Sequence, residues 1–487
     1  MKSTMKPLTR ILDGLVDAER VPSLNIAGLT VDSRRLAPAD AFLAVKGTHG
    51  HGIEHAESAL RAGAAVVLHD GDAPVPEAIA TRCIEVPGLA AALPTLCNRY
   101  WDDPASSLDL TAVTGTNGKS SVAWLLAQAL GGGMIGTLGI GRPNALSAAS
   151  HTTPDLPSLY KALAGLRDDG VCKVVIEASS HALDQQRLAG LGFGSVIFTN
   201  LERDHLDYHG TQEVYGQAKA RLFTDYPSRH QLINVDDAFG RRLADQLQDS
   251  PGLVTYGLET ARGPDVLGTI RRATLDGLQM DVNTPEGRVC CTSRLIGRIN
   301  ASNIAIVIAE LTVRGYSVRD IAGMVAELDP VPGRMNRIDG PAGQCVVIDY
   351  AHSPAALENA LATLRQVTNE RLVCVFGCGG KRDSGKRPMM GRIAESLADE
   401  VILTNDNPRG EDPMKILREI QAGMARPDRV RVIPDRRQAI GCAVAGAGVG
   451  DCVLVAGKGH EQSQDLGEKV IAFSDFDAVK SALVEAA

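Results

Sequence analysis

The chain has 487 residues, of which 44% are hydrophobic, 22% are charged and only 4% are aromatic, and its formal net charge is −8. This length suits about three domains with ordinary buried cores. The acidic balance argues against a nucleic-acid-binding protein, which would usually present a basic face, and the few aromatic residues argue against a base-stacking surface.

The ten cysteines are scattered, mostly singly within apolar runs, and no Cys-x-x-Cys pair occurs. This usage predicts reduced, buried thiols in a cytosolic protein rather than a disulfide framework or a zinc site. Residues 1–8 lack the apolar run of a signal peptide, and no run reaches the ~18 apolar residues of a membrane span. We therefore expect a cytoplasmic protein without a membrane segment.

Residues 1–103 predict a small α/β domain. Its apolar runs predict one helix and two short strands, at 11–16, 41–45 and 64–68. Polar loops at 31–35 and 47–52 follow apolar segments, where binding surfaces are often built, but taken alone they are better explained as ordinary turns. Residues 101–104 predict a linker to the next domain.

The most informative stretch is an apolar run that leads through the loop Thr114-Gly-Thr-Asn-Gly-Lys-Ser120 into a predicted helix. Gly115 and Gly118 let backbone N–H groups turn toward phosphate oxygens, and the helix N-terminus adds partial positive charge. In such a P-loop, Lys119 reaches the β- and γ-phosphates and the Ser120 hydroxyl binds Mg²⁺.

This P-loop is shorter than the full Walker pattern, which places a glycine five residues before Gly118, where this chain has Val113. The alternative is a strand–turn–helix whose glycines only shape a tight turn. Nucleotide binding is favoured, because a Gly-Lys-Ser at a helix start has few structural reasons to exist.

The central domain, residues 104–331, contains two further predicted strands, at 173–176 and 195–200, each followed by polar residues. In open α/β sheets, ligands bind beyond the carboxyl ends of the strands, so we expect the P-loop, Glu177 and His205 to meet in one crevice. Both side chains suit Mg²⁺ beside phosphates. For His205, a capping or hydrogen-bonding role is the alternative.

Two later helical patterns carry polar residues of uncertain role. A predicted helix over 212–223 places Lys219 among small and apolar residues, and the ordinary interpretation is a surface lysine. Asn300 and Asn303 lie at the start of another predicted helix. They could cap that helix or contact a purine edge, and position alone does not decide.

Residues 332–487 predict a doubly wound, Rossmann-like domain. The predicted strands are 345–348, 372–376, 401–403, 430–433 and 452–456, and the helices between them are 355–364, 389–397, 413–424 and 436–444. The polar loops that follow the strands are 349–352, 377–383, 405–409 and 457–461. No Gly-x-Gly-x-x-Gly follows a strand here, which argues against a dinucleotide fold. Solvated turns would explain these loops, but Arg382 and Arg409 are suited to clamping carboxylates.

Six motifs together resemble the Mur ligases, which are ATP-dependent amide-forming enzymes of peptidoglycan synthesis. They are Thr114-Gly-Thr-Asn-Gly-Lys-Ser120, Thr152-Thr-Pro154, Glu177-Ala-Ser-Ser-His181, Arg203-Asp-His205, Asp349-Tyr-Ala-His352 and Gly457-Lys-Gly-His-Glu461. They occur in the family's order over nearly the whole chain. Asp406-Asn-Pro-Arg409 is similar to the motif of the branch that adds meso-diaminopimelate, whereas lysine-adding members tend to lack that arginine.

The resemblance implies an α/β chain of three domains. These would be a UDP-sugar-binding domain at 1–103, a central parallel-sheet ATP-binding domain at 104–331 and a Rossmann-like amino-acid-binding domain at 332–487. The implied reaction adds meso-diaminopimelate to the D-glutamate of a UDP-N-acetylmuramoyl dipeptide through an acyl phosphate, with ATP and Mg²⁺. We expect a monomer that binds neither nucleic acid nor membrane.

The resemblance also implies individual roles. Catalysis would involve Lys119, Glu177, His205 and Lys219, with Lys219 carbamylated. Mg²⁺ would be bound by Ser120, Glu177, His205 and the carbamate of Lys219. ATP would be bound by Thr114, Gly115, Thr116, Asn117, Gly118, Lys119, Ser120, Asn303, Arg334, Asp349 and His352. The UDP-sugar dipeptide would be bound by Val31, Ser33, Thr48, His49, Gly50, Thr152, Thr153, Ser179, Gln185 and Arg187. Diaminopimelate would be bound by Arg382, Asp406, Asn407, Pro408, Arg409, Gly457 and Glu461.

The chain departs from the family pattern at two positions. His151 stands where an asparagine is expected before Thr152, which puts one substrate contact in doubt. Lys381 replaces an aspartate in the Gly-Gly-Asp-Arg-Asp pattern, which changes the local charge beside Arg382. The alternatives are a folylpolyglutamate-synthase-like ligase, which shares the P-loop pattern, and a P-loop NTPase that acts as a switch. The extra N-terminal domain and residues 406–409 count against the first.

Overall fold

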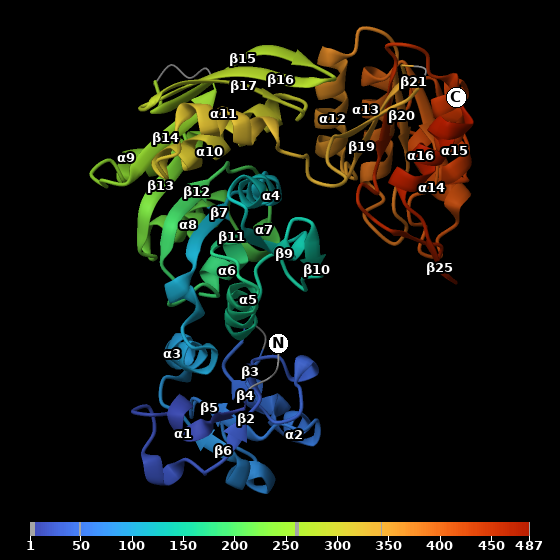
Figure 1. Cartoon of the computed structure of the whole chain (residues 1–487). Coiled ribbons are helices and arrows are strands. Elements are labelled where there is room, and N and C mark those ends of the chain that lie inside the picture. Colours follow the sequence, from blue (N-terminus) through green and yellow to red (C-terminus); the bar gives the residue numbers. More distant parts are fainter. Residues whose placement is uncertain (1–4, 48–49, 259–262, 342, 487) are drawn as a thin grey trace. The chain divides into compact units, whose positions relative to one another are not determined.

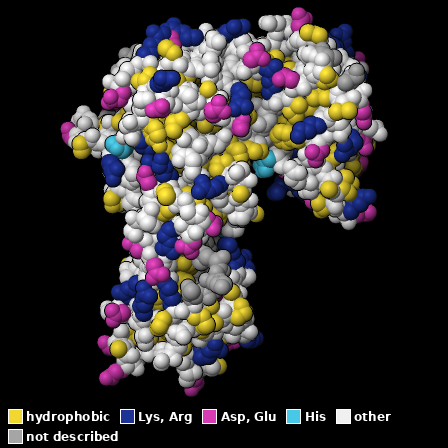
Figure 2. Space-filling model, in the orientation of Figure 1, with side chains coloured by type: hydrophobic (Ala, Val, Ile, Leu, Met, Phe, Trp, Pro, Cys, Tyr) yellow, Lys and Arg dark blue, Asp and Glu magenta, His cyan; other side chains and the backbone are white. Residues whose placement is uncertain are grey.

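The computed structural model describes residues 5–47, 50–258, 263–341 and 343–486. The chain forms two compact units, Met1–Asp265 and Val266–Ala487 (Figure 1). Among the described residues, no helix is both long enough and apolar enough to span a membrane. On the face shown in Figure 2, basic and acidic side chains are interspersed rather than gathered by sign.

The first unit begins with a four-stranded parallel sheet in the order β3-β4-β5-β6. Its strands are β3 Gly28–Thr30, β4 Asp40–Ala44, β5 Val66–His69 and β6 Cys83–Glu85, and a small pair is formed by β1 Lys6–Pro7 and β2 Asn25–Ile26. Its helices are α1 Leu8–Ile11, α2 Ala56–Arg61 and α3 Leu89–Trp101. The strands predicted at 41–45 and 64–68 are confirmed to within two residues.

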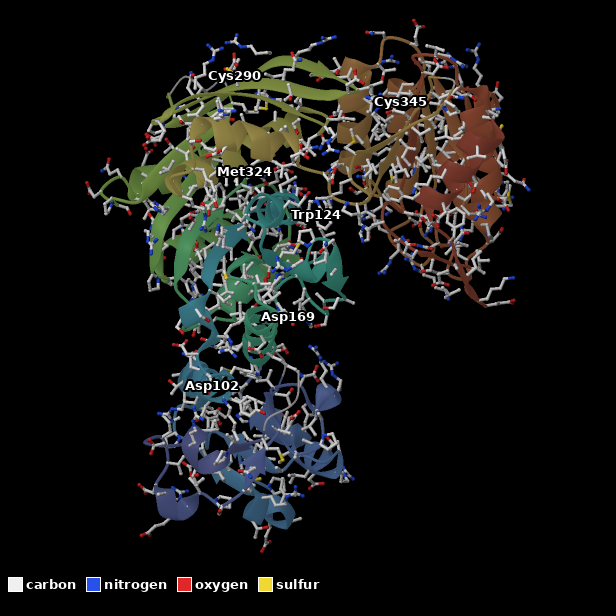
Figure 3. All side chains as sticks on the ribbon, viewed as in Figure 1. Asp102, Trp124, Asp169, Cys290, Met324 and Cys345 are labelled. Atoms are coloured by element: carbon white, nitrogen blue, oxygen red, sulfur yellow. The ribbon has the colours of Figure 1, made fainter. Side chains whose placement is uncertain are left out.

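One prediction in this region is wrong, and one boundary is shifted by a residue. The helix predicted over 11–16 ends at Ile11, and the chain then reverses at Gly14, whose φ of +66° is left-handed. The predicted linker begins later than expected, because Trp101 is the last residue of α3 and is only 5% exposed. The connection is made by Asp102, marked in Figure 3, and Asp103, both with left-handed backbone.

The second sheet of this unit has the order β10-β9-β8-β11-β7-β12-β13-β14. The bounds are β7 Asp109–Thr114, β8 Gly133–Gly136, β9 Gly139–Arg142, β10 Ala145–Ser147, β11 Lys173–Glu177, β12 Phe193–Phe198, β13 Ser228–Asn234 and β14 Leu253–Leu258. Strands β8, β11, β7, β12, β13 and β14 are parallel. Because β7 lies between β11 and β12, the segments that follow these three strands share one edge of the sheet.

The helices around this sheet are α4 Lys119–Ala129, α5 Leu156–Asp168, α6 Ser180–Asp184, α7 Leu206–His209, α8 Gln212–Thr224 and α9 Ala238–Gln246. Four of them have an N-cap side chain that accepts a hydrogen bond from a backbone N–H group of the first turn. The caps are Asp155 for α5, Ser179 for α6, Thr211 for α8 and Asp237 for α9. Helix α4, which carries Trp124 in Figure 3, buries most of its residues. The apolar runs around the P-loop therefore build a core.

The second unit opens with an antiparallel meander of β15 Val266–Thr274, β16 Gly277–Thr284 and β17 Gly287–Ser293. Helices α10 Arg298–Val313 and α11 Val318–Ala326 follow. The N-cap of α10 is Gly297, with a φ of +90°, so Asn300 and Asn303 lie inside the helix and do not cap it. Instead, Asn303 Nδ2 donates to Asn300 Oδ1 at 3.1 Å.

The remaining sheet has the order β18-β19-β23-β20-β21-β22, and only the edge strand β18 is antiparallel. The bounds are β18 Asn336–Asp339, β19 Cys345–Asp349, β20 Leu372–Phe376, β21 Glu400–Leu403, β22 Arg431–Val432 and β23 Cys452–Ala456, with a hairpin of β24 Ser463–Asp465 and β25 Val470–Ala472. The five predicted strands and the doubly wound interpretation are confirmed.

Helices cover both faces of this sheet (Figure 1). They are α12 Pro354–Val367, α13 Lys386–Leu397, α14 Pro413–Gln421, α15 Arg436–Gly446 and α16 Asp475–Glu485. Successive strand residues point to opposite faces, so Val347 and Cys374 pack toward α12–α14, whereas Val346 and Val375 pack toward α15 and α16. The four predicted helices between the strands are confirmed, with boundary shifts of up to three residues.

Candidate active site

The P-loop joins β7 to α4 through two glycines with positive φ, +148° at Gly115 and +87° at Gly118. Lys119 is the first residue of α4, and its Nζ donates to the carbonyl oxygens of Gly115 at 2.8 Å and Thr116 at 2.9 Å. The ammonium group is therefore held over the loop, at the helix N-terminus where phosphate groups bind in such motifs.

The loop is fixed to the end of β12 by residues that the sequence did not single out. Thr199 Oγ1 donates to Asn117 O at 2.6 Å, and Asn200 Oδ1 accepts from Asn117 N at 2.9 Å. A Cβ at position 115 would lie 1.9 Å from Thr199 Oγ1, so only glycine fits there. The available signal was a pair of polar residues directly after a strand that neighbours β7.

Gly115→Ala is expected to abolish ATP binding and to lower the free energy of unfolding by about 1–3 kcal/mol, because the new methyl group meets Thr199 at a positive φ. Thermal unfolding with and without ATP measures both effects. The double variant Gly115→Ala/Thr199→Ala removes one clashing atom and should regain part of the loss. No recovery would show that the Thr199 contact is not the cause.

Glu177, the last residue of β11, is fully buried beside the P-loop helix. Its Oε2 accepts from Ser120 Oγ at 2.9 Å, and its Oε1 accepts from Thr137 N at 2.9 Å. Burial raises the pKa of this carboxyl, and the Lys119 ammonium and these hydrogen bonds oppose the rise. A buried carboxylate beside a hydroxyl is an oxygen donor set of the kind that Mg²⁺ prefers. Thr137 was not anticipated from the sequence.

Lys219 is 1% exposed, so the interpretation as a surface lysine is wrong. Its Nζ donates to Gly115 O at 2.7 Å and lies 4.3 Å from the centre of the Tyr215 ring. Burial, together with the Lys119 ammonium, holds the pKa of Lys219 well below its usual value. A buried amine of lowered pKa has a larger neutral fraction, which is the form that reacts as a nucleophile.

His205 belongs to a separate aromatic cluster next to these groups. Its ring centre lies 4.9 Å from that of His181 and 6.0 Å from that of Tyr215. Tyr215 in turn donates its hydroxyl to Thr116 Oγ1 at 3.2 Å, so one tyrosine links the P-loop, Lys219 and His205. Within the described residues, no three His, Cys, Asp or Glu side chains form a metal-binding cluster. The residues present nevertheless fit Mg²⁺ through the oxygen atoms of Ser120 and Glu177.

Five residues assigned to the dipeptide form one network beside Glu177. Thr153 Oγ1 donates to Glu177 O at 2.5 Å and accepts from Ser179 N at 3.0 Å. Arg187 donates to Thr153 O at 2.9 Å and to Gln185 Oε1 at 2.6 Å. The Thr152 and Thr137 hydroxyls are 2.9 Å apart. His151 is exposed, and its Nδ1 lies 3.1 Å from Ser150 Oγ.

The residues assigned to the uridine nucleotide lie in the first sheet and its loops. Val31 follows β3 and Ser33 begins a short 3-10 turn, and both are partly exposed. Gly50 is exposed, and Thr48 and His49 lie outside the described residues. From the same region Arg35 Nη1 donates to Ser150 Oγ at 3.1 Å, which connects this surface to the loop before Thr152.

In the second unit, the loops that follow the parallel strands β19, β20, β21 and β23 meet at one edge of the sheet. Gly457 N donates to Asp349 O at 3.0 Å, and Gly380 N donates to Asn407 O at 2.9 Å. A Cβ at position 457 would lie 2.6 Å from Asp406 Oδ2. Each of the four loops predicted from strand ends thus contacts at least one other: loop 457–461 contacts 349–352 and 405–409, and loop 405–409 also contacts 377–383.

Among the residues assigned to ATP, Asp349 lies at the end of β19 and accepts from Met335 N at 2.8 Å. Burial raises the pKa of Asp349 to about 6, and the nearby Arg334 opposes this rise. His352 is exposed, and its Nδ1 lies 2.8 Å from Tyr350 O. Asn303 is buried within α10.

The two arginines assigned to diaminopimelate lie close to one loop. A Cβ at Gly379 would be 2.6 Å from Arg409 Nη1 and 3.8 Å from Arg382 Cγ. Arg409 has a φ of +50°, an unfavourable backbone for a residue with a side chain and a frequent mark of functional sites. Buried Asp406 and half-buried Glu461 supply negative charge on neighbouring loops. The edge thus offers both cations and anions, which suits an amino acid with two charged ends.

Arg387 stabilises these loops through ion pairs, and the sequence did not predict this role. It is 1% exposed and forms ion pairs with Glu411 at 2.8 Å and Glu419 at 2.5 Å. Glu411 in turn accepts from Lys381 N at 3.0 Å, where Lys381 also has a positive φ of +50°. The turn at Lys381 is therefore held by a backbone hydrogen bond, which does not depend on the side chain at this position. The Lys381 side chain itself is exposed.

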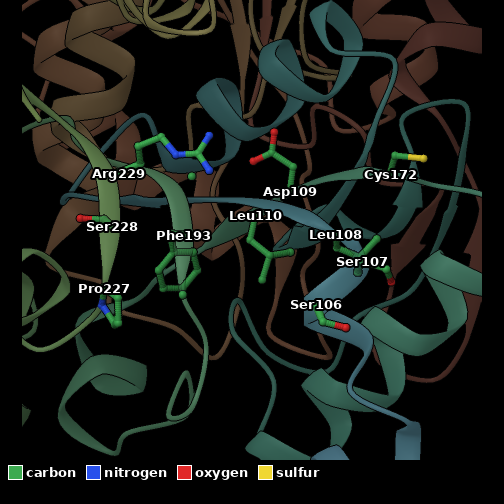
Figure 4. Close-up of a pocket in the computed structure, with 12 residues that line it drawn as sticks. Ser106, Ser107, Leu108, Asp109, Leu110, Cys172, Phe193, Pro227, Ser228 and Arg229 are labelled. Carbon is green, nitrogen blue, oxygen red and sulfur yellow. The ribbon is translucent and has the colours of Figure 1, made fainter.

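A cavity of about 690 Å³ opens at the other edge of the P-loop sheet (Figure 4). It is lined by the amino ends of β7, β12 and β13 and the residue before β11, including Asp109, Cys172, Phe193 and Arg229. None of the residues with predicted roles lines it. Ligands of open α/β sheets bind at the carboxyl ends of strands, so this cavity lies at the opposite edge from the one where a ligand is expected.

Comparison with known proteins identifies three matching families along the chain. Residues 25–101 match the Mur ligase family, catalytic domain, residues 113–311 match the Mur ligase middle domain, and residues 333–459 match the Mur ligase, glutamate ligase domain. A UDP-N-acetylmuramoyl-L-alanyl-D-glutamate–2,6-diaminopimelate ligase from Chromobacterium violaceum is 46% identical over 471 residues, 94% of each chain.

Solved structures give the same picture of the fold. One of a UDP-N-acetylmuramoyl-L-alanyl-D-glutamate–2,6-diaminopimelate ligase is 32% identical, covers 99% of each chain and has a TM-score of 0.75. A MurF ligase from Thermotoga maritima, solved with ADP, shares the fold at 16% identity and a TM-score of 0.58, over 94% of this chain and 97% of its own.

Proposed function

Because the chain belongs to the Mur ligase family, we propose that it joins meso-2,6-diaminopimelate to the D-glutamate of UDP-N-acetylmuramoyl-L-alanyl-D-glutamate, with cleavage of ATP to ADP and phosphate. The observation that carries this proposal is the 46% identity, over 94% of each chain, to a ligase of that name. The charged loops of the second unit support it through their chemistry, because they offer partners for both ends of such an amino acid.

The reaction needs activation, because a carboxylate is a poor electrophile. Transfer of the γ-phosphoryl group of ATP to the D-glutamyl carboxylate gives an acyl phosphate and ADP, and attack by an amine of diaminopimelate then forms the amide and releases phosphate. Lys119 would hold the β- and γ-phosphates and stabilise the charge that develops during transfer. Thr152, Thr153 and Arg187 would place the carboxylate beside the P-loop.

Mg²⁺ would neutralise part of the negative charge gathered between the phosphates and the carboxylate. Ser120 and Glu177 would hold it, with His205 and a carbamylated Lys219 for a second ion. The carbamate forms when the neutral Lys219 amine adds to carbon dioxide and loses one proton. The buried Nζ and its lowered pKa support this step.

Arg409→Ala is expected to lower kcat/KM for diaminopimelate about 30-fold, because a charge-assisted pair to the distal carboxylate is lost. The kcat/KM for lysine, which has no distal carboxylate, should change little. The ratio of kcat/KM for diaminopimelate to that for lysine should therefore fall. Steady-state phosphate release with each amino acid measures both. Equal rates with diaminopimelate and lysine in the unaltered protein would contradict the role of Arg409.

The decisive experiment mixes the protein with ATP, the UDP-dipeptide and candidate amino acids, and determines the mass of the product. The expected mass of the product is the mass of the UDP-dipeptide plus that of diaminopimelate, minus that of one water molecule. ATP hydrolysis that needs no amino acid would favour the NTPase alternative, and extension of a folate by glutamate would favour the folylpolyglutamate alternative.

The setting of this activity is peptidoglycan precursor synthesis, which supports cell shape and cell division. We infer a cytoplasmic, monomeric enzyme, because its nucleotide substrates are cytoplasmic and all the required motifs lie in one chain. Sedimentation of the purified protein tests the monomer, for which about 51 kDa is expected.

A further inference from the structure

We propose that Lys458 is a positioning residue of the amino-acid site, which holds Glu461 as a fixed anion so that its second carboxylate oxygen binds an ammonium group of the substrate. Lys458 lies directly after β23, in the loop 457–461, and has no role in the assignments above. The inference rests on the proposed function, because it concerns how diaminopimelate is bound.

The burial of Lys458 is the first observation. The residue is 0% exposed, although a buried ammonium is unfavourable unless it is paired and hydrogen-bonded. Its Nζ lies 2.7 Å from Glu461 Oε2 and 3.1 Å from Asn407 Oδ1. An apolar side chain would fill this position at a lower desolvation cost than lysine. The buried charge therefore indicates a role beyond packing.

The second observation is the orientation of the triangle formed by Lys458, Asn407 and Glu461. Asn407 Nδ2 donates to Glu461 Oε2 at 2.9 Å, and its Oδ1 also accepts from Asp465 N at 2.9 Å. Both donors to the Glu461 carboxylate, Lys458 Nζ and Asn407 Nδ2, therefore reach Oε2, and neither of them binds Oε1. Since 30% of the Glu461 side chain is exposed, Oε1 is the atom through which this carboxylate would meet a ligand.

The charges around Glu461 support the same role. Lys458, Arg409 and buried Arg436 favour its ionised form, whereas burial opposes it. Tyr350, His460 and Asp406 also face this region, and Asp406 adds like charge. The net result is a pKa of Glu461 below its usual value. Without Lys458, the nearest cation would be gone and burial would raise this pKa.

Lys458→Met is the direct test, with Lys480→Met as the matched control, since Lys480 is exposed on α16. The expected result is a KM for diaminopimelate raised about 10-fold or more, with kcat and the KM for ATP nearly unchanged. The acid limb of kcat/KM for diaminopimelate should also move to higher pH. This follows because binding is lost as pH falls through the pKa of Glu461, and that pKa rises in the variant.

A role in packing alone would lower stability without moving the acid limb. An unshifted acid limb in a folded Lys458→Met protein would overturn the proposal. If that variant does not fold, Lys458→Gln replaces the ammonium by an uncharged hydrogen-bond donor and should show the same shift. In a Glu461→Gln background, Lys458→Met should add no further increase in KM, and an added increase would also overturn it. Absence of diaminopimelate-dependent turnover in the unaltered protein would instead contradict the proposed function.

Discussion

Lys119→Met is expected to lower kcat about 10³-fold, because it removes the cation that stabilises charge on the transferred phosphoryl group. The structure holds Lys119 Nζ over the loop by two backbone carbonyls, so methionine would keep the stem but not the charge. Single-turnover formation of ADP in the presence of the UDP-dipeptide measures the step directly.

The control for this variant is Lys161→Met, at an exposed position of α5 in the same unit. It should retain the activity of the unaltered protein, and thermal unfolding should show that both variants are folded. Near-normal ADP formation in Lys119→Met would mean that the loop does not bind the triphosphate as proposed. A folded Lys119→Met protein that has lost its affinity for ATP would support the proposed role of the loop in binding the triphosphate.

Lys219→Ala is expected to reduce activity at least about 100-fold, because it removes the amine that would carry the carbamate and with it one acidic ligand of the second Mg²⁺. The variant leaves a buried gap beneath Gly115 and Tyr215. A short carboxylate such as formate or acetate could enter this gap and should restore part of the activity.

A second readout does not depend on turnover. Protein incubated with ¹³C-labelled bicarbonate should show a carbamate carbon signal that is absent from Lys219→Ala. Full activity in the alanine variant would refute the role of Lys219. A rescue by chloride equal to that by formate would show that the effect needs no carboxylate oxygen.

Several parts of this molecule were predictable because they depend on short stretches of sequence. The P-loop was predicted from its glycines and Gly-Lys-Ser, and the strands of the last sheet were predicted from apolar runs of β-branched residues. Where the backbone departs from an ordinary pattern, as at Gly14, the boundary of α1 was misplaced. The roles of the individual site residues stay predictions until the variants are measured.

Other parts depend on which strands become neighbours. Thr199 and Asn200 support the P-loop only because β12 lies beside β7, and Thr137 contacts Glu177 only because β8 lies beside β11. The partners in these contacts are 40 residues apart in the chain for Thr137, 82 for Thr199 and 83 for Asn200. The local hydrophobic pattern of a segment does not indicate which distant strand will become its neighbour in the sheet.

The sequence by itself determined the family, the α/β class and the residue types that carry charge and phosphate chemistry. Only the tertiary structure decided that Lys219 and Lys458 are buried, since each lies in a segment whose local pattern also fits a surface lysine. Burial is the sum of contacts from distant segments, and it sets whether an amine is a hydrated surface cation or a reactive or positioning group.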